Sequence, residues 1–446
     1  MSIWIPYTQF NETTQRRLIR DLTIPRTSRR PPMAGKPVLP EGESLYAFDV
    51  EGGDIRIPYH YARNTLGVVP NGDRYPKLSE KHVSTMTGKL RPGQERAIGI
   101  IIPELRQTGV SRAIMAPGTG KTIVGAHTTA TLGYPTIVVV PIKKLVAQWR
   151  KTYEMVVPTA SVWMVGVDKN IPTDRPDVII SLDTQIKNIP VEWRKMYGLL
   201  VVDEAHMFAT PTRIKALLSI RPLHILIETA TPVRLDGLHL AIEAVGGKAG
   251  AVIDSVSPYK MRVVEMSYVH PEEVYTSRGV NYGALCDSIS ADESYNRTIV
   301  GIVKANPSNK FIILTLRVSH GETLKNMLTE ADVTCDTLTG CKNRYTDSRV
   351  LVGTFSKIGT GFDEANACED FGGVKSDSLI ICQSIASPPN FEQYRGRVMR
   401  SENPVVYWLN TGNRVIRSHL TKMKKEVVSS GGVIENVKGE DYLRGL

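Results

Sequence analysis

The stretch Ala113–Thr122, AIMAPGTGKT, decides the fold of this chain. Ala113–Met115 predicts the end of a buried strand, and the glycines after it predict a tight strand-to-helix turn. Glycines allow the backbone to wrap so that its N–H groups point at phosphate oxygens, and the helix N-terminus adds positive potential. Lys121 is expected to reach the β- and γ-phosphates of a nucleotide, and the Thr122 hydroxyl to ligate Mg²⁺. The stretch therefore predicts a phosphate loop in a parallel α/β domain.

The phosphate loop is expected to use six consecutive residues, namely Pro117, Gly118, Thr119, Gly120, Lys121 and Thr122. The usual pattern has a glycine where this chain has Met115, but this difference leaves the amide cradle intact. The alternative interpretation is a glycine-rich turn that binds no ligand. The Lys-Thr pair that follows the glycines favours the phosphate loop.

A second chemical motif lies about 80 residues downstream, at the end of another apolar run. Leu199–Val202 is continuously apolar, as expected of a strand that is buried on both faces. It ends in Asp203 and Glu204. Asp203 is expected to hold Mg²⁺ through water, and Glu204 to polarise the attacking water, because metal binding and proton removal are separate tasks. The alternative is a solvated acidic turn, but the upstream phosphate loop favours an ATPase site.

The order of further motifs resembles that of the superfamily 2 helicases, over roughly residues 88–430. This resemblance implies that Arg91 and Gln94 bind the nucleotide, with Gln94 at the adenine. It implies contacts to the nucleic-acid backbone from a set of residues in the first half of the chain: Pro141, Lys143, Gln148, Thr184 and Gln185. It also implies that three residues couple hydrolysis to strand movement: His206, Thr229 and Thr231.

The resemblance continues in the second half of the chain. Gln393–Arg400, QYRGRVMR, fits the family's QxxGRxxR pattern at every fixed position. There Gln393 is expected to be catalytic, and Arg397 and Arg400 to be arginine fingers at the γ-phosphate. Their spacing of three predicts one helical face. The resemblance assigns nucleotide contacts to Gly361 and Asp363, and nucleic-acid contacts to Arg317, Thr354, Lys357 and Thr360.

The pattern of apolar runs predicts an α/β fold with two tandem RecA-like domains, whose parallel sheets are covered by helices. In the first domain, short strands are expected at 113–115, 136–140, 178–181, 199–202 and 225–228. In the second, they are expected at 311–316, 350–354, 379–382 and 405–409, with helices at 295–304, 391–399 and 416–427.

The first 86 residues differ from the rest. They carry a basic leader with several arginines, a proline-rich connector, and two expected strands at 44–50 and 54–59 around the Gly52-Gly53 turn. They predict a small strand-rich substrate-binding domain. The expected division is therefore 1–86, then 87–260 with the phosphate loop, then 261–446 with the arginine fingers and a basic C-terminal tail.

Composition limits the class of protein. The net charge is +10, which favours an anionic partner such as nucleic acid. No apolar run approaches the ~20 residues that span a bilayer, and the N-terminus lacks the pattern of a signal peptide. We therefore expect no membrane partner and a cytoplasmic location. The expected cofactors are ATP and Mg²⁺, and the expected partner is forked, branched or single-stranded DNA, bound by a monomer.

The chain resembles the phage branch-migration helicases of the UvsW type in three features. These are the DEAH form of Asp203–His206, the small N-terminal segment, and the lack of an attached nuclease or methyltransferase. This resemblance implies an ATP-dependent helicase that remodels forks and four-way junctions. Three alternatives remain: a duplex translocase subunit of a restriction or remodelling complex, an RNA helicase, and an ATP-gated clamp that does not move.

Overall fold

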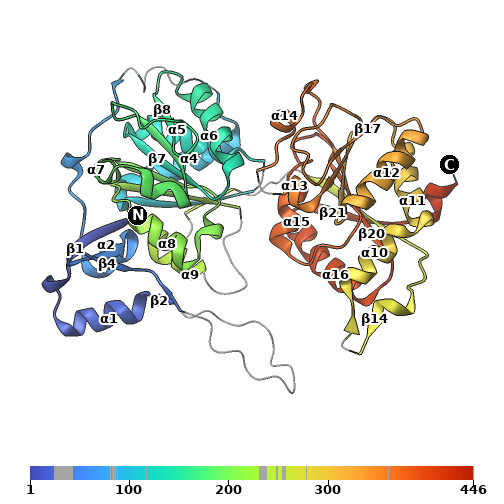
Figure 1. Cartoon of the computed structure of the whole chain (residues 1–446), viewed down its shortest axis with the longest axis horizontal. Coiled ribbons are helices and arrows are strands. Elements are labelled where there is room, and N and C mark those ends of the chain that lie inside the picture. The colour runs from blue at the N-terminus through green and yellow to red at the C-terminus, as the bar shows by residue number, and fades with distance from the viewer. Residues whose placement is uncertain are drawn as a thin grey trace. The chain divides into compact units, whose positions relative to one another are not determined.

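The computed structural model describes residues 1–24, 44–80, 82, 87, 89–116, 118–230, 239–247, 250–253, 258–277, 279–359 and 361–444. They form two compact units (Figure 1). The first comprises 1–115 and 119–254, and the second includes 255–446. Each unit has its own seven-stranded parallel sheet and its own hydrophobic cores.

The N-terminal segment forms a small three-stranded antiparallel sheet in the order β1-β5-β4. Gly52 and Gly53 have positive φ angles of 61° and 86°, as the tight β4–β5 turn requires. The strand expected at 44–50 is broken into β3 and β4. The elements are β1 (Ser2–Pro6), η1 (Tyr7–Gln9), α1 (Glu12–Leu22), β2 (Thr23–Ile24), β3 (Leu45–Tyr46), β4 (Asp49–Glu51), β5 (Asp54–Pro58), α2 (Tyr59–Leu66) and η2 (Gly72–Arg74).

The main sheet of the first unit has seven parallel strands in the order β12-β6-β11-β10-β7-β9-β8. Its elements are α4 (Pro92–Thr108), β6 (Val110–Met115), α5 (Lys121–Leu132), β7 (Thr136–Val140), α6 (Lys143–Val156), β8 (Val162–Met164), β9 (Val178–Leu182), η3 (Asp183–Asn188), α7 (Val191–Arg194), β10 (Leu199–Val202), η4 (Ala205–Phe208), α8 (Pro211–Leu218), β11 (His224–Thr229), α9 (His239–Gly246) and β12 (Ala251–Ile253).

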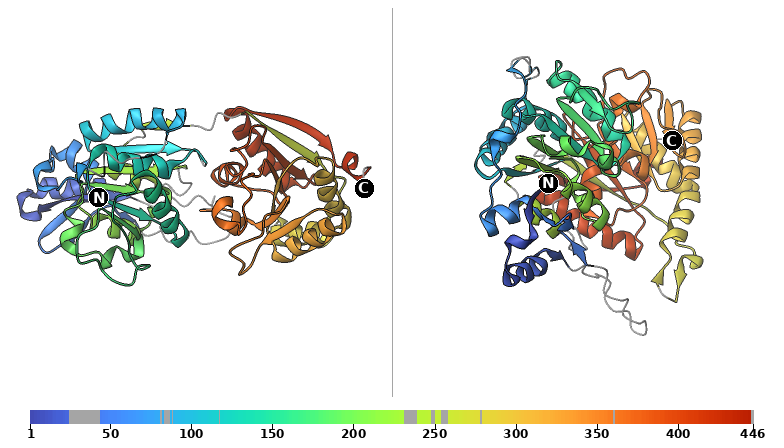
Figure 2. Two further views of the ribbon diagram at one scale, coloured as in Figure 1. Left: turned by 90° about the horizontal axis from the view of Figure 1, so that it is seen from above. Right: turned by 60° about the vertical axis from the view of Figure 1, so that its left-hand side comes forward.

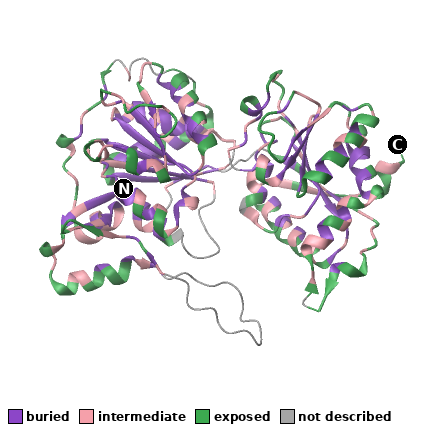
Figure 3. Cartoon of the chain, viewed as in Figure 1, coloured by how far each residue is buried: buried purple, intermediate pink, exposed green. Residues whose placement is uncertain are grey.

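Both faces of this sheet are buried, and helices cover both (Figures 2 and 3). Leu199 and Val201 of β10 pack into one core together with residues of α4, α5 and α6. Leu200 and Val202 pack into the opposite core. Successive side chains of a strand point to opposite faces, so a strand covered on both sides must be apolar throughout. This is why the apolar runs predict the strands well.

The N-terminal segment is part of the same unit, because its core is continuous with one face of the main sheet. Met1, Leu22 and Ile57 belong to the same cluster of buried residues as Ile137 and Leu200. The Met1 ammonium donates to the Leu217 carbonyl, at 2.5 Å, and to the Ile220 carbonyl. The segment is therefore fixed to α8 and the residues that follow it.

The second unit also has a sheet of seven parallel strands, in the order β17-β18-β16-β19-β20-β13-β21. Its elements are β13 (Tyr259–Glu265), η5 (Glu272–Val274), β14 (Tyr275–Thr276), β15 (Gly279–Val280), α10 (Tyr282–Ala291), α11 (Glu293–Lys304), β16 (Phe311–Thr315), α12 (Val318–Glu330), β17 (Cys335–Leu338), β18 (Val350–Thr354), α13 (Phe355–Ile358), α14 (Glu364–Ala367), β19 (Ser378–Ile381), α15 (Pro388–Arg395), β20 (Val405–Asn410), α16 (Arg414–Ser429), β21 (Gly432–Lys438) and α17 (Glu440–Leu443).

The two parallel sheets with flanking helices confirm the predicted tandem RecA-like fold. One prediction within it is wrong: Arg397 and Arg400 do not lie on a helix. Helix α15 ends at Arg395, and the next residues form tight turns in which the Arg397 N–H bonds to Tyr394 O and the Val398 N–H to Arg395 O. Gly396 follows the last helical residue, and glycine favours the end of a helix.

Among the described residues, no helix combines the length and apolar character that crossing a membrane requires.

Candidate nucleotide-binding site

The phosphate loop has the predicted local geometry. Gly118 and Gly120 have φ angles of 83° and 90°, which side-chain-bearing residues rarely adopt. Helix α5 begins at Lys121, immediately after Gly120. The amides of the first turn of α5 therefore lie at a helix N-terminus, where anions bind. Pro117, also assigned to the loop, lies outside the described residues.

Lys121 and Glu204 form an ion pair, with Lys121 Nζ 3.1 Å from Glu204 Oε1. Burial works to lower the pKa of Lys121, but the Glu204 and Asp203 carboxylates outweigh it, so that the pKa is raised. Lys121 therefore stays protonated, as a phosphate-binding lysine must. The structure brings together the two motifs that the sequence places about 80 residues apart.

Asp203 is buried and is held by two N–H donors. Trp149 Nε1 donates to Asp203 Oδ2 at 2.9 Å, and the Glu204 backbone N–H donates to Oδ1 at 2.8 Å. Burial, followed by the nearby Glu204 carboxylate, raises the pKa of Asp203 to about 6. Each oxygen accepts one bond and keeps a further lone pair for another ligand. The sequence predicts that Trp149 is packed between elements, but it does not predict this contact with Asp203.

Glu204 has a left-handed backbone, with φ 51° and ψ 47°. This conformation is uncommon for a residue other than glycine, and it costs on the order of 1–3 kcal/mol when the surroundings impose it. Such strain concentrates at active sites. The turn directs Glu204 toward Lys121 while Asp203 stays within the buried strand end.

Gln94 lies where an adenine subsite is expected. Its side chain is buried, with Oε1 accepting from the Arg91 N–H at 2.9 Å and Nε2 donating to the Thr119 carbonyl at 3.1 Å. Gln94 thus joins the start of α4 to the phosphate loop. It lines a pocket of about 180 Å³ together with Arg91, Ile123 and His127. Ile123 and His127 were not predicted, because their place in the pocket depends on how α4 packs on α5.

The predicted coupling residues also meet. His206 Nδ1 lies 3.1 Å from Thr229 Oγ1, which links the acidic strand end to the end of β11. Thr231 lies outside the described residues. Glu228, next to Thr229, was missed: it is fully buried, and neither carboxyl oxygen has a hydrogen-bond partner among the residues that the structure describes. Burial, then the Asp203 charge, raises its pKa well above the usual value.

The residues predicted to contact nucleic acid in the first unit lie at the ends of β7 and β9. Pro141 is buried and Lys143 is exposed at the start of α6, while Thr184 and Gln185 lie in η3. Gln148 lies farther along α6, and its Nε2 is 3.4 Å from Thr122 Oγ1. Gln148 thus faces the nucleotide site.

In the second unit, the two predicted finger arginines bind the loop that carries Gly361 and Asp363. Arg397 donates to the Phe362 carbonyl at 2.7 Å and to the Gly359 carbonyl at 2.6 Å. Arg400 Nη1 lies 2.8 Å from Asp363 Oδ2. Burial opposes ionisation of Asp363, but the Arg400 hydrogen bond outweighs it and lowers the pKa of Asp363.

The remaining residues predicted in the second unit lie near ends of its elements. Arg317 precedes α12 and pairs with Asp287 at 2.7 Å. Thr354 ends β18, and Lys357 on α13 donates to Asn343 Oδ1 at 2.9 Å. Gly361 has a φ of 73°, and Gln393 lies on α15. Thr360 lies outside the described residues.

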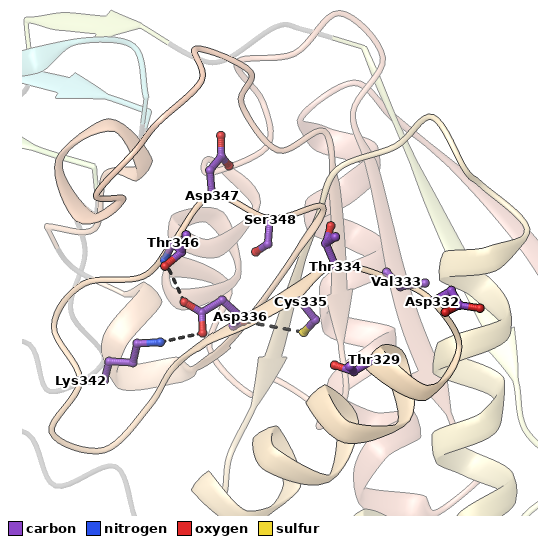
Figure 4. Close-up of a pocket in the computed structure, with 10 residues that line it drawn as sticks. All are labelled: Thr329, Asp332, Val333, Thr334, Cys335, Asp336, Lys342, Thr346, Asp347 and Ser348. Carbon is purple, nitrogen blue, oxygen red and sulfur yellow. Dashed lines mark hydrogen bonds and ion pairs between the residues drawn. The ribbon is translucent and has the colours of Figure 1, made fainter.

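The second unit also has an open surface pocket of about 680 Å³ beside β17 (Figure 4). Asp336 lies among its lining residues and accepts from Lys342 Nζ at 2.6 Å and from the Thr346 N–H at 2.8 Å. None of the predicted site residues in the described part of the chain lines this pocket. This pocket is therefore separate from the site that the sequence predicts.

Comparison with known proteins agrees with this geometry. Residues 87–234 match the family described as "Type III restriction enzyme, res subunit". The chain is 26% identical over 394 residues to "Putative helicase 055L" of Frog virus 3 (isolate Goorha), covering 87% of each chain. It is 24% identical over 408 residues to "Transcript termination protein A18" of Rabbitpox virus (strain Utrecht), covering 80% of this chain and 78% of that one.

Among solved structures, S. cerevisiae Dbp5 bound to RNA and ADP BeF3 aligns with a TM-score of 0.54 at 13% identity, over 80% of this chain and 96% of that one. At this identity the likeness shows the fold alone. The tandem RecA-like units, the paired phosphate-loop and acidic motifs, and the sequence relatives together support an ATP-driven enzyme of the superfamily 2 helicase type.

Proposed function

We propose that this helicase acts on DNA, and that it unwinds or branch-migrates forks and four-way junctions as helicases of the UvsW type do. The observation that carries the proposal is the firm attachment of the N-terminal segment to the first RecA-like unit. A helicase that remodels branched DNA needs an element that holds one arm while the motor moves another, and that element must not shift relative to the motor.

The attachment is made by backbone hydrogen bonds and by a shared core. Ser2 N–H donates to the Ile220 carbonyl at 3.1 Å, and Ser2 Oγ to the Leu218 carbonyl at 2.5 Å. Tyr59 and Ile57 are fully or almost fully buried in the core that also contains β10. A force applied to the N-terminal sheet would therefore reach the motor directly.

Helix α1 of this segment presents basic side chains to solvent. Arg16, Arg17 and Arg20 have side-chain exposures of 82%, 56% and 76%. Their acidic partners are Glu12 and Asp21, and exposed ion pairs of this kind are weak. The arginines can therefore exchange these partners for phosphates, which gives binding without sequence preference. We assign α1 to an arm of the branched substrate.

ATP and Mg²⁺ are the cofactors of the proposed reaction. Thr122 and Asp203 offer the hydroxyl and carboxylate oxygens that Mg²⁺ prefers, and two protein ligands are enough because Mg²⁺ usually adds phosphates and water. When bound, Mg²⁺ would neutralise charge on the phosphates. Lys121 would bind the phosphates, and Glu204 would accept the proton of the attacking water. Gln393 is assigned a catalytic role, and Arg397 and Arg400 are assigned to the γ-phosphate as arginine fingers.

Coupling would run through the contact between His206 and Thr229. This contact joins the second residue after the Asp203-Glu204 pair to the end of β11, so a change at the γ-phosphate can be transmitted to β11. The nucleic acid would be held mainly through phosphates by the residues that the sequence assigns to it, because a motor must step over any sequence.

The second candidate is an RNA helicase. This candidate is favoured by the similarity to the Rabbitpox virus protein that is named "Transcript termination protein A18". The chemistry of the ATP site is the same for both, so the choice depends on the polymer that stimulates hydrolysis and is displaced.

One panel of labelled substrates tests the proposal: a fork, a four-way junction, duplexes with 3′ or 5′ overhangs, and an RNA duplex, each with ATP and Mg²⁺. We expect displacement of the fork and junction strands, and none by Lys121→Ala. Displacement of RNA but not DNA would reject the DNA assignment. Junction processing by Lys121→Ala that equals wild type would reject the motor.

A further inference from the structure

The geometry points to Trp149 as a positioning residue for Mg²⁺–nucleotide binding: its indole N–H holds the carboxylate of Asp203, which is assigned to Mg²⁺. The neighbouring Gln148 supports the second oxygen ligand, the Thr122 hydroxyl. This inference rests on the ATPase assignment and is independent of whether the helicase acts on DNA or RNA.

The contact itself is short and buried. Trp149 is fully buried, Asp203 is 3% exposed, and the two atoms lie 2.9 Å apart. A hydrogen bond to an ionised carboxylate is stronger than one between neutral groups, and low surrounding polarity strengthens it further. The Glu204 backbone N–H donates to the other oxygen. The two donors together therefore restrict rotation of the Asp203 carboxylate about its Cβ–Cγ bond.

Helix α6 brings Trp149 to Asp203. Its buried face is formed by side chains at spacings of three and four: Leu145, Val146, Trp149, Thr152, Tyr153 and Val156. This face packs in the core that also contains Val201 of β10 and Val124 of α5. Trp149 therefore lies on a rigid element that contacts both the phosphate-loop helix and the strand that ends in Asp203.

The close approach of α5 to the indole requires a glycine. A Cβ added at Gly125 would lie 2.5 Å from Trp149 Cη2, which is closer than real Cβ atoms come to their neighbours. Glycine within a helix lowers the stability of the helix by roughly 1 kcal/mol relative to alanine. The close approach of the indole is a packing reason for glycine at this position. Gly125 leaves the space in which the indole reaches Asp203.

Gln148 adds a second contact from the same turn of α6. Its Nε2 lies 3.4 Å from Thr122 Oγ1, a longer contact than that of Trp149. Consecutive residues of one helix thus reach both residues assigned to Mg²⁺. Partners that orient metal ligands typically contribute 10- to 100-fold to metal affinity or activity.

Trp149→Phe is the variant that tests the inference, because it keeps an aromatic ring in the core and removes the N–H. Trp163 supplies a matched control. It is also a buried tryptophan of the first unit, and its Nε1 has no hydrogen-bond partner in the part of the chain that the structure describes. Trp163→Phe therefore makes the same chemical change without loss of a hydrogen bond.

The measurement is binding of a fluorescent ADP to the full chain as a function of Mg²⁺ concentration, without nucleic acid. For Trp149→Phe we expect the Mg²⁺ concentration at half-saturation to rise 10- to 100-fold, with ADP affinity in EDTA unchanged. Trp163→Phe should match wild type. Gly125→Ala should shift the Mg²⁺ requirement in the same direction as Trp149→Phe.

An unchanged Mg²⁺ requirement in Trp149→Phe would overturn the inference, as would an equal loss of ADP affinity with and without Mg²⁺. A double-mutant cycle sharpens the result: on an Asp203→Asn background, Trp149→Phe should add no further Mg²⁺ defect. Because no nucleic acid is present, failure here leaves the proposed DNA function untouched, and failure of the substrate panel leaves this inference untouched.

Discussion

Lys121 and Glu204 neutralise each other across the phosphate loop, with 3.1 Å between Lys121 Nζ and Glu204 Oε1. The proposed function gives the two residues different tasks once ATP binds, because Lys121 would be needed at the phosphates and Glu204 at the attacking water. The ion pair is therefore a resting arrangement, in which Glu204 keeps Lys121 charged. On the proposed function, bound ATP would replace Glu204 as the partner of Lys121.

Glu204→Gln should separate these tasks. The amide keeps the shape of the side chain but cannot accept the proton, so the hydrolysis rate should fall on the order of 10²-fold or more. ATP affinity should be retained, because Lys121 no longer has to leave a carboxylate. The measurements are steady-state hydrolysis and equilibrium ATP binding.

Glu154→Gln is the matched control, since Glu154 forms an exposed ion pair with Arg150 on the same unit. It should leave both quantities unchanged. A Glu204→Gln protein that hydrolyses ATP at the wild-type rate would exclude Glu204 as the base.

The exposed arginines of α1 lead us to expect that DNA affinity depends on salt concentration. Arg16→Ala combined with Arg20→Ala should weaken binding of forked DNA and reduce the slope of log affinity against log salt by up to about 2, because each phosphate contact contributes about 0.9 to that slope. ATP hydrolysis without nucleic acid should not change. Fluorescence anisotropy over a salt series measures the effect.

The control removes the same charge from the second unit, at Arg297 and Arg444, whose side chains are 55% and 78% exposed. If this variant reduces the salt slope as much as the α1 variant does, the effect is general electrostatics and α1 has no special role.

The sequence predicts the central strands well because burial on two faces leaves little choice of residue. The expected bounds of β7, β10 and β18 are those observed. The strands β8, β12, β13, β17 and β21 were not predicted, and they lie at or next to the sheet edges, where polar residues are tolerated. In β21, for example, Glu435 and Asn436 interrupt the apolar pattern.

The residues of the candidate site were also predicted only in part. Lys121, Asp203 and Glu204 are recognisable because their chemistry is local to short motifs. Trp149 and Glu228 could not be found, since Trp149 has the spacing of a core residue and Glu228 interrupts an apolar strand without a motif of its own. Their roles depend on the packing of α5, α6 and β11, which sequence periodicity does not specify.

The burial of Glu228 predicts that the stability of the folded protein depends on pH. An unfolded chain gives glutamate a pKa of about 4.3, while burial raises the pKa of Glu228 well above that in the folded protein. Between these two values the folded state holds a proton that the unfolded state has released. Stability must therefore fall as pH rises through this window, at a rate of up to about 1.4 kcal/mol per pH unit.

Glu228→Gln removes the titrating group at nearly constant volume. Its melting temperature relative to wild type should rise between pH 5 and pH 8, because only the wild type loses stability over that range. Differential scanning fluorimetry measures the two curves, and the exposed Glu154→Gln serves as the control. Parallel curves for Glu228→Gln and wild type would show that Glu228 is ionised in the folded protein.

Arg397 and Arg400 should differ in what they contribute, although both are assigned to the γ-phosphate. Arg397 donates two hydrogen bonds to the backbone of the 359–363 loop, whereas Arg400 makes one ion pair with Asp363. Arg397→Ala leaves the Gly359 and Phe362 carbonyls without this donor. It should lower the melting temperature by several degrees, while Arg400→Ala should change it little.

Hydrolysis rates of the two variants distinguish a structural role from a catalytic one. Arg400→Ala should keep ATP affinity and reduce hydrolysis on the order of 10³-fold, because a finger acts on charge that develops in the transition state. Arg397→Ala should combine a similar rate loss with the loss of stability, and Arg297→Ala should do neither. Wild-type hydrolysis by Arg400→Ala would reject its finger role, and equal melting temperatures for the two variants would reject the anchoring role of Arg397.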